Sequence, residues 1–352
     1  MKSIGSIFIT CVSLILLCFS CSKKRHTVTR SFYYWKNYAE FSASDTTLLS
    51  GMGVQKMYIR LFDVDWSYAQ RPVPRDVVNI WLNTISHMKH MELVPVVYIT
   101  NRTLQNCDFK TLRKLAVQVS AKVEKVGRMD YWKDNPCVMG RELQIDCDWS
   151  ASTREKYFYL LNCLRSSSPG VKLSCTIRLH QVKYMEKTGV PPVDRGMLMV
   201  YNTGSPTASR EMNSIFDSNE ARKYLDLQLK YPLPLDAALP LFSWGKWYRG
   251  EKFMGLLHDM NSQKIGDMGF FSHQQGAQWR CESDTALGLF YLRKGDRVVI
   301  EEVPDDKLKM AAELASSFIS NDSLSVSFYH FDTNLVKHYG NAELENIYNS
   351  FH

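Results

Sequence analysis

The sequence lacks several patterns that mark common classes of protein. It contains no glycine-rich phosphate-binding motif of the GxGxxG or Walker type, which argues against an open, doubly wound nucleotide-binding sheet. Beyond the amino-terminal region, lysine and arginine form no block of more than a few residues, so the formal net charge of +7 does not predict a nucleic-acid partner. No internal repeat or low-complexity segment is present, and no motif predicts a cofactor.

The cysteines that follow position 21 lack the spacing of a metal-binding or redox motif. They are Cys107, Cys137, Cys147, Cys163, Cys175 and Cys281, and no two of them form a CxxC pair. Cys147 and Cys175 fall on the apolar sides of neighbouring predicted strands, with Cys163 on the helix between them, so we expect buried free thiols. A disulfide among these three is the alternative in an oxidising compartment. No ligand spacing in the sequence predicts a metal ion.

The apolar run at residues 7–19 is too short to cross a membrane as a helix. It follows Lys2 and has the length of a signal-peptide core. It ends in Cys18-Phe19-Ser20-Cys21, which resembles a bacterial lipobox because a small residue precedes the cysteine that would be lipidated. This resemblance implies a signal peptide over residues 1–20, a lipid on Cys21 and a flexible tether over residues 21–30. A secretory signal with an incidental cysteine is the alternative.

We therefore expect a cell-envelope lipoprotein, held on the membrane by its lipid and facing the periplasm or the cell surface. The tether carries basic residues that would lie close to anionic headgroups. We expect the protein to be a monomer.

Strand and helix patterns alternate along the rest of the chain. The eight predicted strands cover residues 32–35, 56–66, 93–100, 141–149, 171–179, 197–202, 237–244 and 323–331. The predicted helices cover residues 74–90, 108–126, 152–165, 219–229, 305–320 and 342–351, and Ser44 or Asp45 is the predicted cap of a further short helix before Gly51. Eight strands with interleaved helices favour a closed α/β barrel, the (β/α)8 or TIM barrel, in a single domain over residues 31–352.

Residues 245–303 form too long a segment for an ordinary connection between the seventh and eighth strands. The sequence predicts a helix over residues 251–260 and a β-hairpin that pairs residues 287–292 with residues 297–303. We therefore expect a helix-plus-hairpin insertion on the barrel.

The stretch RELQIDCDWS, residues 141–150, carries most of the information about function. Side chains alternate between the two faces of a strand, so one face is polar and acidic and the other is apolar. The polar face comprises Glu142, Gln144, Asp146 and Asp148. In a parallel barrel the carboxyl ends of the strands form the ligand site, which places Asp146 and Asp148 there.

Acidic and aromatic residues also end the other predicted strands. Carboxylates among tryptophan and tyrosine predict a carbohydrate site, because acids hold hydroxyls or transfer protons and flat rings stack on sugars. We therefore expect an oligosaccharide or polysaccharide ligand. The candidate catalytic acids are Asp146, Asp148, Asp63 and Asp65, and the candidate substrate-binding residues are Trp66, Trp149, Arg178, Tyr201, Asn202 and Trp244.

Two of these strand ends resemble motifs of a known family. Asp146-Cys147-Asp148-Trp149 resembles the core of the Asp-x-x-Asp-x-Asp-x-Glu signature of chitinase-like family 18 glycoside hydrolases, and Met199-Val200-Tyr201-Asn202 is similar to their Met-x-Tyr-Asp. The resemblance implies a TIM barrel and transfers Asp146, Asp148 and Tyr201 as site residues. The Gln-Ile-Asp-x-Asp run and the Ser-Cys-Thr strand also resemble a group of bacterial barrel proteins of unassigned activity.

The match to family 18 ends at two positions. Ser150 stands where the family has its catalytic glutamate, and Asn202 stands where it has the last aspartate of Met-x-Tyr-Asp. A serine hydroxyl cannot act as a general acid near neutral pH, so the family's substrate-assisted mechanism does not transfer to this chain.

Three interpretations follow. In the first, the protein is a glycoside hydrolase in which Asp146 or Asp148 works with Asp63 or Asp65, because close like charges raise the pKa of one acid and create a proton donor beside a base. In the second, it is a non-catalytic glycan-binding barrel. In the third, Asp146 and Asp148 pair with Arg60 or Arg178 inside the barrel mouth and serve charge balance.

Overall fold

We describe the fold from a computed structural model. The structure describes residues 26–351 except residues 37, 40, 81–90, 128–140, 208–211, 226 and 228. The lipobox with Cys21, Cys137 and most of the helix predicted over residues 74–90 lie outside the described residues. No helix within the described part of the chain is both long enough and apolar enough to cross a membrane.

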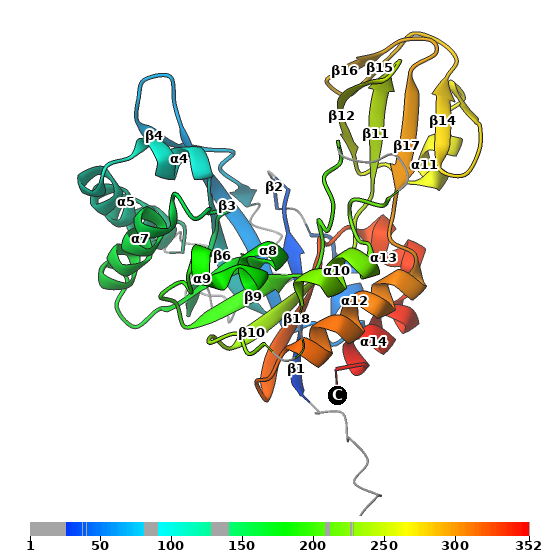
Figure 1. Ribbon diagram of the computed structural model, residues 1–352. Helices are drawn as coiled ribbons and strands as arrows, with labels where there is room; N and C mark the ends of the chain where they lie inside the picture. The colour runs from blue at the N-terminus through cyan, green and yellow to red at the C-terminus, as the bar shows by residue number, and fades with distance from the viewer. Residues whose placement is uncertain are drawn as a thin grey trace, which may run out of the picture.

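Eight parallel strands close into a barrel (Figure 1). They are β1 (Thr27–Tyr34), β3 (Lys56–Trp66), β6 (Glu92–Ile99), β7 (Glu142–Asp146), β8 (Lys172–Arg178), β9 (Arg195–Met199), β10 (Leu235–Pro240) and β18 (Ser323–Tyr329). β1 closes the ring, because Phe32 is in register with Phe328 of β18 on one side and with Met57 of β3 on the other. The predicted (β/α)8 barrel is confirmed. Since β1 begins at Thr27, the tether predicted to reach residue 30 is too long.

Helices cover the outside of the barrel between successive strands, apart from the connection between β3 and β6, which lies partly outside the described residues (Figure 1). The longer ones are α5 (Phe109–Gly127), α7 (Arg154–Ser167) and α12 (Asp305–Phe318). The shorter ones are α2 (Ala43–Gly51), α4 (Asn101–Asn106), α8 (Leu179–Lys183), α9 (Met185–Thr188), α10 (Ser218–Tyr224), α13 (Thr333–Tyr339) and α14 (Asn341–Asn349). α5 shows why these segments are helical, because its residues Leu112, Leu115, Ala116 and Val119 recur at helical spacing and are all buried.

At two helices, side-chain hydrogen bonds to the backbone define the residue at which the helix begins. The Asp108 carboxylate accepts a hydrogen bond from the Thr111 N–H at 2.7 Å, so α5 begins directly after the residue that the sequence predicts as its cap. The short helix α2 is capped by Ser42, with Asp45 as the second half of a capping box, so neither Ser44 nor Asp45 is the N-cap.

The interior of the barrel is partly polar. The rings of Tyr33 and Tyr58 stack at a centroid distance of 4.9 Å, and the Tyr33 hydroxyl donates to Gln144 at 2.5 Å. Gln144 and Asp146 of β7 are both buried, although they lie on the polar face of the strand. The polar face of β7 therefore points into the barrel rather than into solvent.

The helix predicted to start at Pro74 is wrong at its amino end. Residues Pro72–Arg75 form strand β4, which pairs antiparallel with β3 and places Arg75 opposite Asp63. Proline fixes φ and lacks an N–H, so it is compatible with an edge strand as well as with a first helical turn. The pairing with β3 decides between these two possibilities.

The insertion lies between the seventh and eighth barrel strands, as predicted, but its internal structure differs. It is a five-stranded antiparallel sheet in the order β12-β11-β17-β14-β13. The strands are β11 (Trp244–Arg249), β12 (Lys252–His258), β13 (Phe271–His273), β14 (Gln278–Cys281) and β17 (Arg297–Glu301), with α11 (Ser262–Gly266) beside them.

The helix predicted over residues 251–260 is wrong, because residues 252–258 form β12. Phe253, Leu256, Leu257 and Met260 have helical spacing, but their segment pairs with β11, and tertiary pairing overrides the local pattern. The predicted hairpin is also wrong. β15 (Thr285–Leu287) pairs with β16 (Phe290–Leu292), while β17 pairs with β11 and β14.

The described cysteines are free thiols. Cys147 and Cys175 are fully buried, whereas Cys163 is only partly buried. The expectation of free thiols is therefore confirmed for all three residues, and the expectation of burial is confirmed for Cys147 and Cys175.

Candidate functional site

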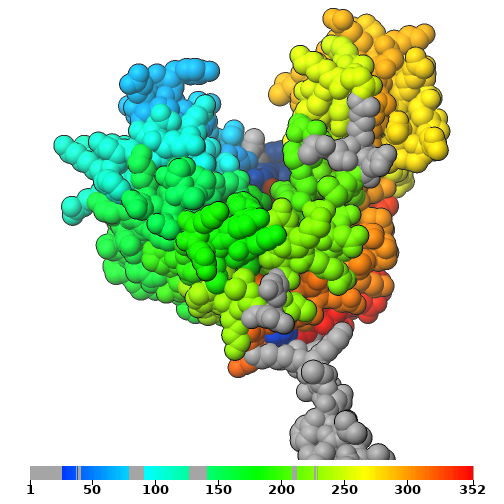
Figure 2. All heavy atoms as spheres, in the orientation of Figure 1, coloured from blue at the N-terminus to red at the C-terminus, as the bar shows by residue number. Residues whose placement is uncertain are grey.

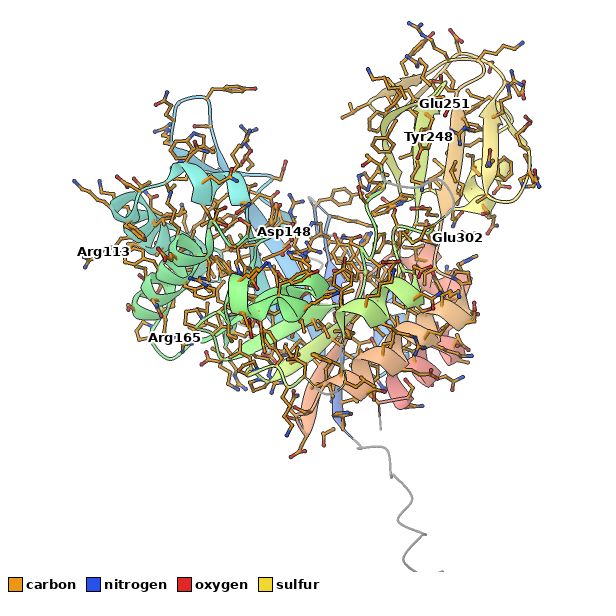
Figure 3. The ribbon with its side chains drawn as sticks, in the orientation of Figure 1. Arg113, Asp148, Arg165, Tyr248, Glu251 and Glu302 are labelled. Atoms are coloured by element: carbon orange, nitrogen blue, oxygen red, sulfur yellow. The ribbon has the colours of Figure 1, made fainter. Side chains whose placement is uncertain are left out.

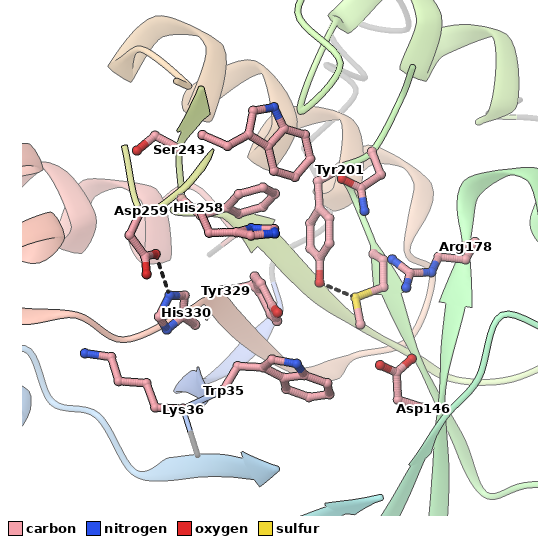
Figure 4. Close-up of a pocket in the computed structure, with 14 residues that line it drawn as sticks. Trp35, Lys36, Asp146, Arg178, Tyr201, Ser243, His258, Asp259, Tyr329 and His330 are labelled. Atoms are coloured by element: carbon pink, nitrogen blue, oxygen red, sulfur yellow. Dashed lines mark hydrogen bonds and ion pairs between the residues drawn. The ribbon is translucent and has the colours of Figure 1, made fainter. Parts of the chain in front are cut away.

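A cleft opens between the lobe that carries the β3–β4 hairpin and the lobe formed by the insertion (Figure 2). A cavity of about 410 Å³ lies at the carboxyl ends of the barrel strands, next to the insertion (Figure 4). It is lined by Trp35, Lys36, Asp146, Arg178, Met199, Tyr201, Asn202, Phe242, Ser243, Trp244, His258, Asp259, Tyr329 and His330. The barrel topology brings these residues together from all parts of the chain.

Asp146 contributes a carboxyl group to the floor of the cavity. It is the last residue of β7, and its carboxylate accepts a hydrogen bond from the Thr176 hydroxyl at 2.6 Å. Burial raises the pKa of Asp146 to about 6, and the neighbouring Asp148 charge adds to this rise, whereas the Arg178 guanidinium opposes it. Asp146 is therefore partly protonated at neutral to mildly acidic pH.

Arg178 lies between two carboxylates at this end of the barrel. Its Nε donates to the Asp148 carboxylate at 2.5 Å. Burial disfavours the charge of Arg178, but Asp146 and Asp148 more than compensate and raise its pKa. Asp148 is about half exposed and lies at the floor of the cleft (Figure 3). The Asp148 carboxylate is thus paired with an arginine and not with a second carboxyl group.

The acids of the second strand are held by arginines of their own. Asp63 accepts from Arg60, and Asp65 accepts from Arg102 and from the Thr100 hydroxyl at 2.9 Å. Burial opposes the ionisation of Asp65, but these hydrogen bonds hold its pKa below the usual value. Neither acid lines the cavity. Asp63 is nevertheless close enough to Asp146 for its charge to contribute to the raised pKa of that residue.

Aromatic rings form the wall of the cavity between its polar ends (Figure 4). The Tyr329 ring lies 5.7 Å from Trp35, 5.5 Å from Tyr201 and 5.6 Å from Phe242, measured between centroids. Phe242 continues the wall to Trp244 at 5.2 Å. The sequence analysis missed Trp35, Phe242 and Tyr329, although Trp35 and Tyr329 lie at ends of predicted strands.

The predicted binding residues divide into two groups. Arg178, Tyr201, Asn202 and Trp244 line the cavity. Trp66 does not line it and packs partly buried against the core.

Trp149 needs a correction, because its indole is only 1% exposed. The ring stacks on Tyr157 at 4.8 Å, and its N–H donates to the Thr188 carbonyl at 3.0 Å. Trp149 therefore packs the core and offers no face to a ligand.

A second polar group lies across the cavity from Asp146 (Figure 4). The His330 Nε2 is 3.6 Å from the Asp259 carboxylate, which lowers the pKa of Asp259. Lys36 forms an ion pair with Asp332 at 2.7 Å. Among the residues that the structure describes, no three His, Cys, Asp or Glu side chains are grouped to hold a metal ion.

The raised pKa of Asp146 predicts a pH-dependent difference between the wild type and Asp146→Asn. Between the ordinary value of 3.8 and the folded value of about 6, the folded protein binds more protons than the unfolded chain, so this group makes the protein less stable as the pH rises. The variant lacks this penalty. Its stability relative to wild type should increase by on the order of 2 kcal/mol from pH 4 to pH 7.

Urea unfolding of both proteins at several pH values measures this difference. Asp236 is also buried with a raised pKa, but it is present in both proteins and cancels in the comparison. A difference that stays constant from pH 4 to pH 7 would show that Asp146 ionises normally.

No protein-family model and no curated protein matches the chain. Solved structures do resemble it. A chitinase from Chromobacterium violaceum ATCC 12472 superposes with a TM-score of 0.53 at 12% identity, covering 92% of this chain and 98% of that one.

The spore cortex-lytic enzyme SleL also resembles the chain in two species. The Bacillus cereus and Bacillus megaterium QM B1551 enzymes each give a TM-score of 0.51 at 11% identity, covering 93% of this chain and 75% of theirs. At these identities the likeness establishes a fold shared with glycoside hydrolase TIM barrels, and it leaves the activity to be argued from the site.

Proposed function

We propose that the protein is an envelope-anchored glycan-binding protein whose barrel mouth holds part of an oligosaccharide or polysaccharide. The cavity carries this proposal, because it combines a wall of aromatic rings with a polar floor. The partly exposed rings of Trp35 and Tyr329 suit the apolar faces of a sugar, while Asp146, Arg178 and Asn202 can bond its hydroxyls. The open cleft above the cavity leaves room for a longer chain (Figure 2).

The arrangement of the carboxylates favours binding over catalysis. Hydrolysis of a glycosidic bond uses two carboxyl groups, one of which donates a proton to the leaving oxygen. Asp63, Asp65 and Asp148 each pair with an arginine. At Ser150 the side chain is a hydroxyl, within hydrogen-bond distance of Ser152 at 2.9 Å, so no carboxylate is available there.

A glycoside hydrolase is the second candidate, and the raised pKa of Asp146 favours it. A buried carboxyl with a pKa of about 6 can hold a proton near neutral pH, as a general acid must. The structural likeness to a chitinase and to spore cortex-lytic enzymes is consistent with either candidate.

The proposed anchor is a lipid on Cys21. Its support is the lipobox-like sequence and the short stretch of chain between Cys21 and the start of β1 at Thr27, which would keep the barrel close to the membrane. Fractionation of cells that express wild type and Cys21→Ser tests it: the variant should leave the membrane fraction, and equal membrane retention would contradict the anchor.

The function is tested with a panel of bacterial, plant and host glycans that includes chitin oligosaccharides and peptidoglycan fragments. We expect wild type to bind at least one member without releasing reducing ends. Asp148→Asn and Asp146→Asn should bind more weakly, because each loses a carboxylate at the floor of the site.

Release of reducing ends by wild type that disappears in Asp146→Asn would select the hydrolase instead. If wild type neither binds nor cleaves any member of the panel, the glycan proposal fails.

A further inference from the structure

Glu301, at the end of β17 in the insertion, contacts Trp244 of the cavity wall but does not itself line the cavity. Its side chain is 5% exposed, and it lies opposite Trp244 in the register between β11 and β17. The indole N–H of Trp244 donates to the Glu301 carboxylate at 2.7 Å. Since Trp244 lines the cavity, Glu301 fixes the orientation of one of the rings available to a ligand.

The same carboxylate binds two further groups. Lys246, which is fully buried, places its ammonium 2.6 Å from Glu301. Ser214 donates both its backbone N–H, at 3.1 Å, and its hydroxyl to Glu301. Ser214 belongs to the chain that follows β9, and its neighbour Ile215 accepts a hydrogen bond from the backbone N–H of Asn202 at 2.7 Å.

One buried carboxylate therefore joins the insertion to the loop that carries Asn202. Trp244 comes from the insertion and Asn202 from the end of the sixth barrel strand, and both line the cavity. A buried ion pair is costly to desolvate and is often no more stabilising than an apolar pair of the same volume. The Glu301 carboxylate nevertheless accepts directional hydrogen bonds from the Trp244 indole and from Ser214. An apolar side chain in its place would leave both groups without a hydrogen-bond partner.

We propose that Glu301 is a positioning residue, which holds the Trp244 ring and the Asn202 loop in the arrangement that receives the sugar. A ring held in place before binding loses less conformational freedom when the ligand arrives, so the affinity is higher. This inference rests on the proposed glycan-binding function. Glu301 itself does not line the cavity, so its effect on the ligand is exerted through Trp244 and the loop.

Two matched double variants test this role without leaving a buried charge unpaired. Lys246→Met with Glu301→Gln keeps an oxygen that can accept from the indole, whereas Lys246→Met with Glu301→Leu removes it. On an array of the glycan panel, the Gln variant should bind within about threefold of wild type and the Leu variant about tenfold more weakly. Thermal unfolding of both variants reports whether the fold is retained.

A second measurement needs no ligand. Acrylamide quenching of Trp244 is obtained by subtracting the fluorescence of the matching Trp244→Phe protein in each background. The Trp244 signal should be more accessible to acrylamide in the Leu variant than in wild type, and unchanged in the Gln variant.

The inference is overturned if the folded Leu variant binds like wild type and shows the same quenching of Trp244. If the Leu variant does not fold, Ser214→Ala decides instead, because it leaves the Lys246–Glu301 pair intact. It should weaken binding about threefold, and unchanged binding would overturn the inference. If wild type binds no glycan, the proposed function fails, while the quenching comparison still decides whether Glu301 positions the indole.

Discussion

Replacing Arg178 with methionine is expected to lower the free energy of unfolding by about 3 kcal/mol and to remove glycan binding, because it leaves two carboxylates without their counter-charge. Arg178 is the cation that opposes the raised pKa of the buried Asp146, and it pairs directly with Asp148. Without it, the pKa of Asp146 should rise further and the floor of the cavity should lose a hydrogen-bond donor.

Urea unfolding and the glycan array measure the two effects. Arg165→Met is the matched control, because Arg165 lies on the outside of α7 (Figure 3) and pairs with Asp194 where both side chains are about 40% exposed. An exposed ion pair of this kind contributes less than about 1 kcal/mol. Equal destabilisation by the two substitutions would show that Arg178 is not a buried counter-charge.

Replacing Trp35 with alanine is expected to weaken glycan binding about thirtyfold, which corresponds to roughly 2 kcal/mol for the loss of a stacking ring at the centre of a site. Trp35 lines the cavity and is only partly buried, so one part of its ring is open to a ligand. Its ring also lies 6.1 Å from Tyr33 and 5.7 Å from Tyr329 between centroids, and the Arg60 guanidinium lies 5.6 Å from its centroid.

Titration calorimetry with a panel member that binds wild type measures this loss. Phe109→Ala is the control, because Phe109 is a large exposed ring on α5 that contacts Tyr159 and does not line the cavity. If Trp35→Ala binds the glycan as tightly as Phe109→Ala does, the Trp35 ring does not contact the ligand, and the proposed role of the aromatic wall is contradicted.

The barrel could be predicted from the sequence because its signals are local. Alternation and β-branched or aromatic residues located all eight strands, and β3 covers residues 56–66 as predicted. The insertion could not be resolved in the same way. Residues 252–258 fit a helix and a strand equally well in sequence, and only pairing with β11 makes them a strand. Pro74 was ambiguous for the same reason, because its strand depends on β3.

The site could be predicted in part, because the ends of parallel strands meet at one end of a barrel. Asp146, Arg178, Tyr201 and Asn202 end or closely follow their barrel strands and line the cavity, whereas Trp244 lines it as the first residue of β11 in the insertion. The rule failed for Trp149, although the alternation along residues 141–149 already puts that side chain on the apolar face with Cys147.

The pairing of the second-strand acids depends on contacts distant in sequence. Arg102 follows the next strand and reaches back to Asp65, and Arg75 lies in the β4 strand that was not predicted. A sequence pattern shows that a carboxylate is present at a strand end, but it does not show which arginine neutralises it. Asp63 and Asp65 are therefore held in separate ion pairs with arginines, and Asp63 acts on Asp146 only through a charge that adds to its raised pKa.

The central claim is that the cavity at the carboxyl ends of the strands receives a sugar. It is tested most directly by a crystal structure of wild type soaked with the tightest-binding member of the glycan panel. We expect density for a sugar ring inside the cavity, in contact with the aromatic wall and within hydrogen-bond distance of Asp146 or Arg178. Sugar density elsewhere on the molecule, with this cavity holding only solvent, would contradict the account.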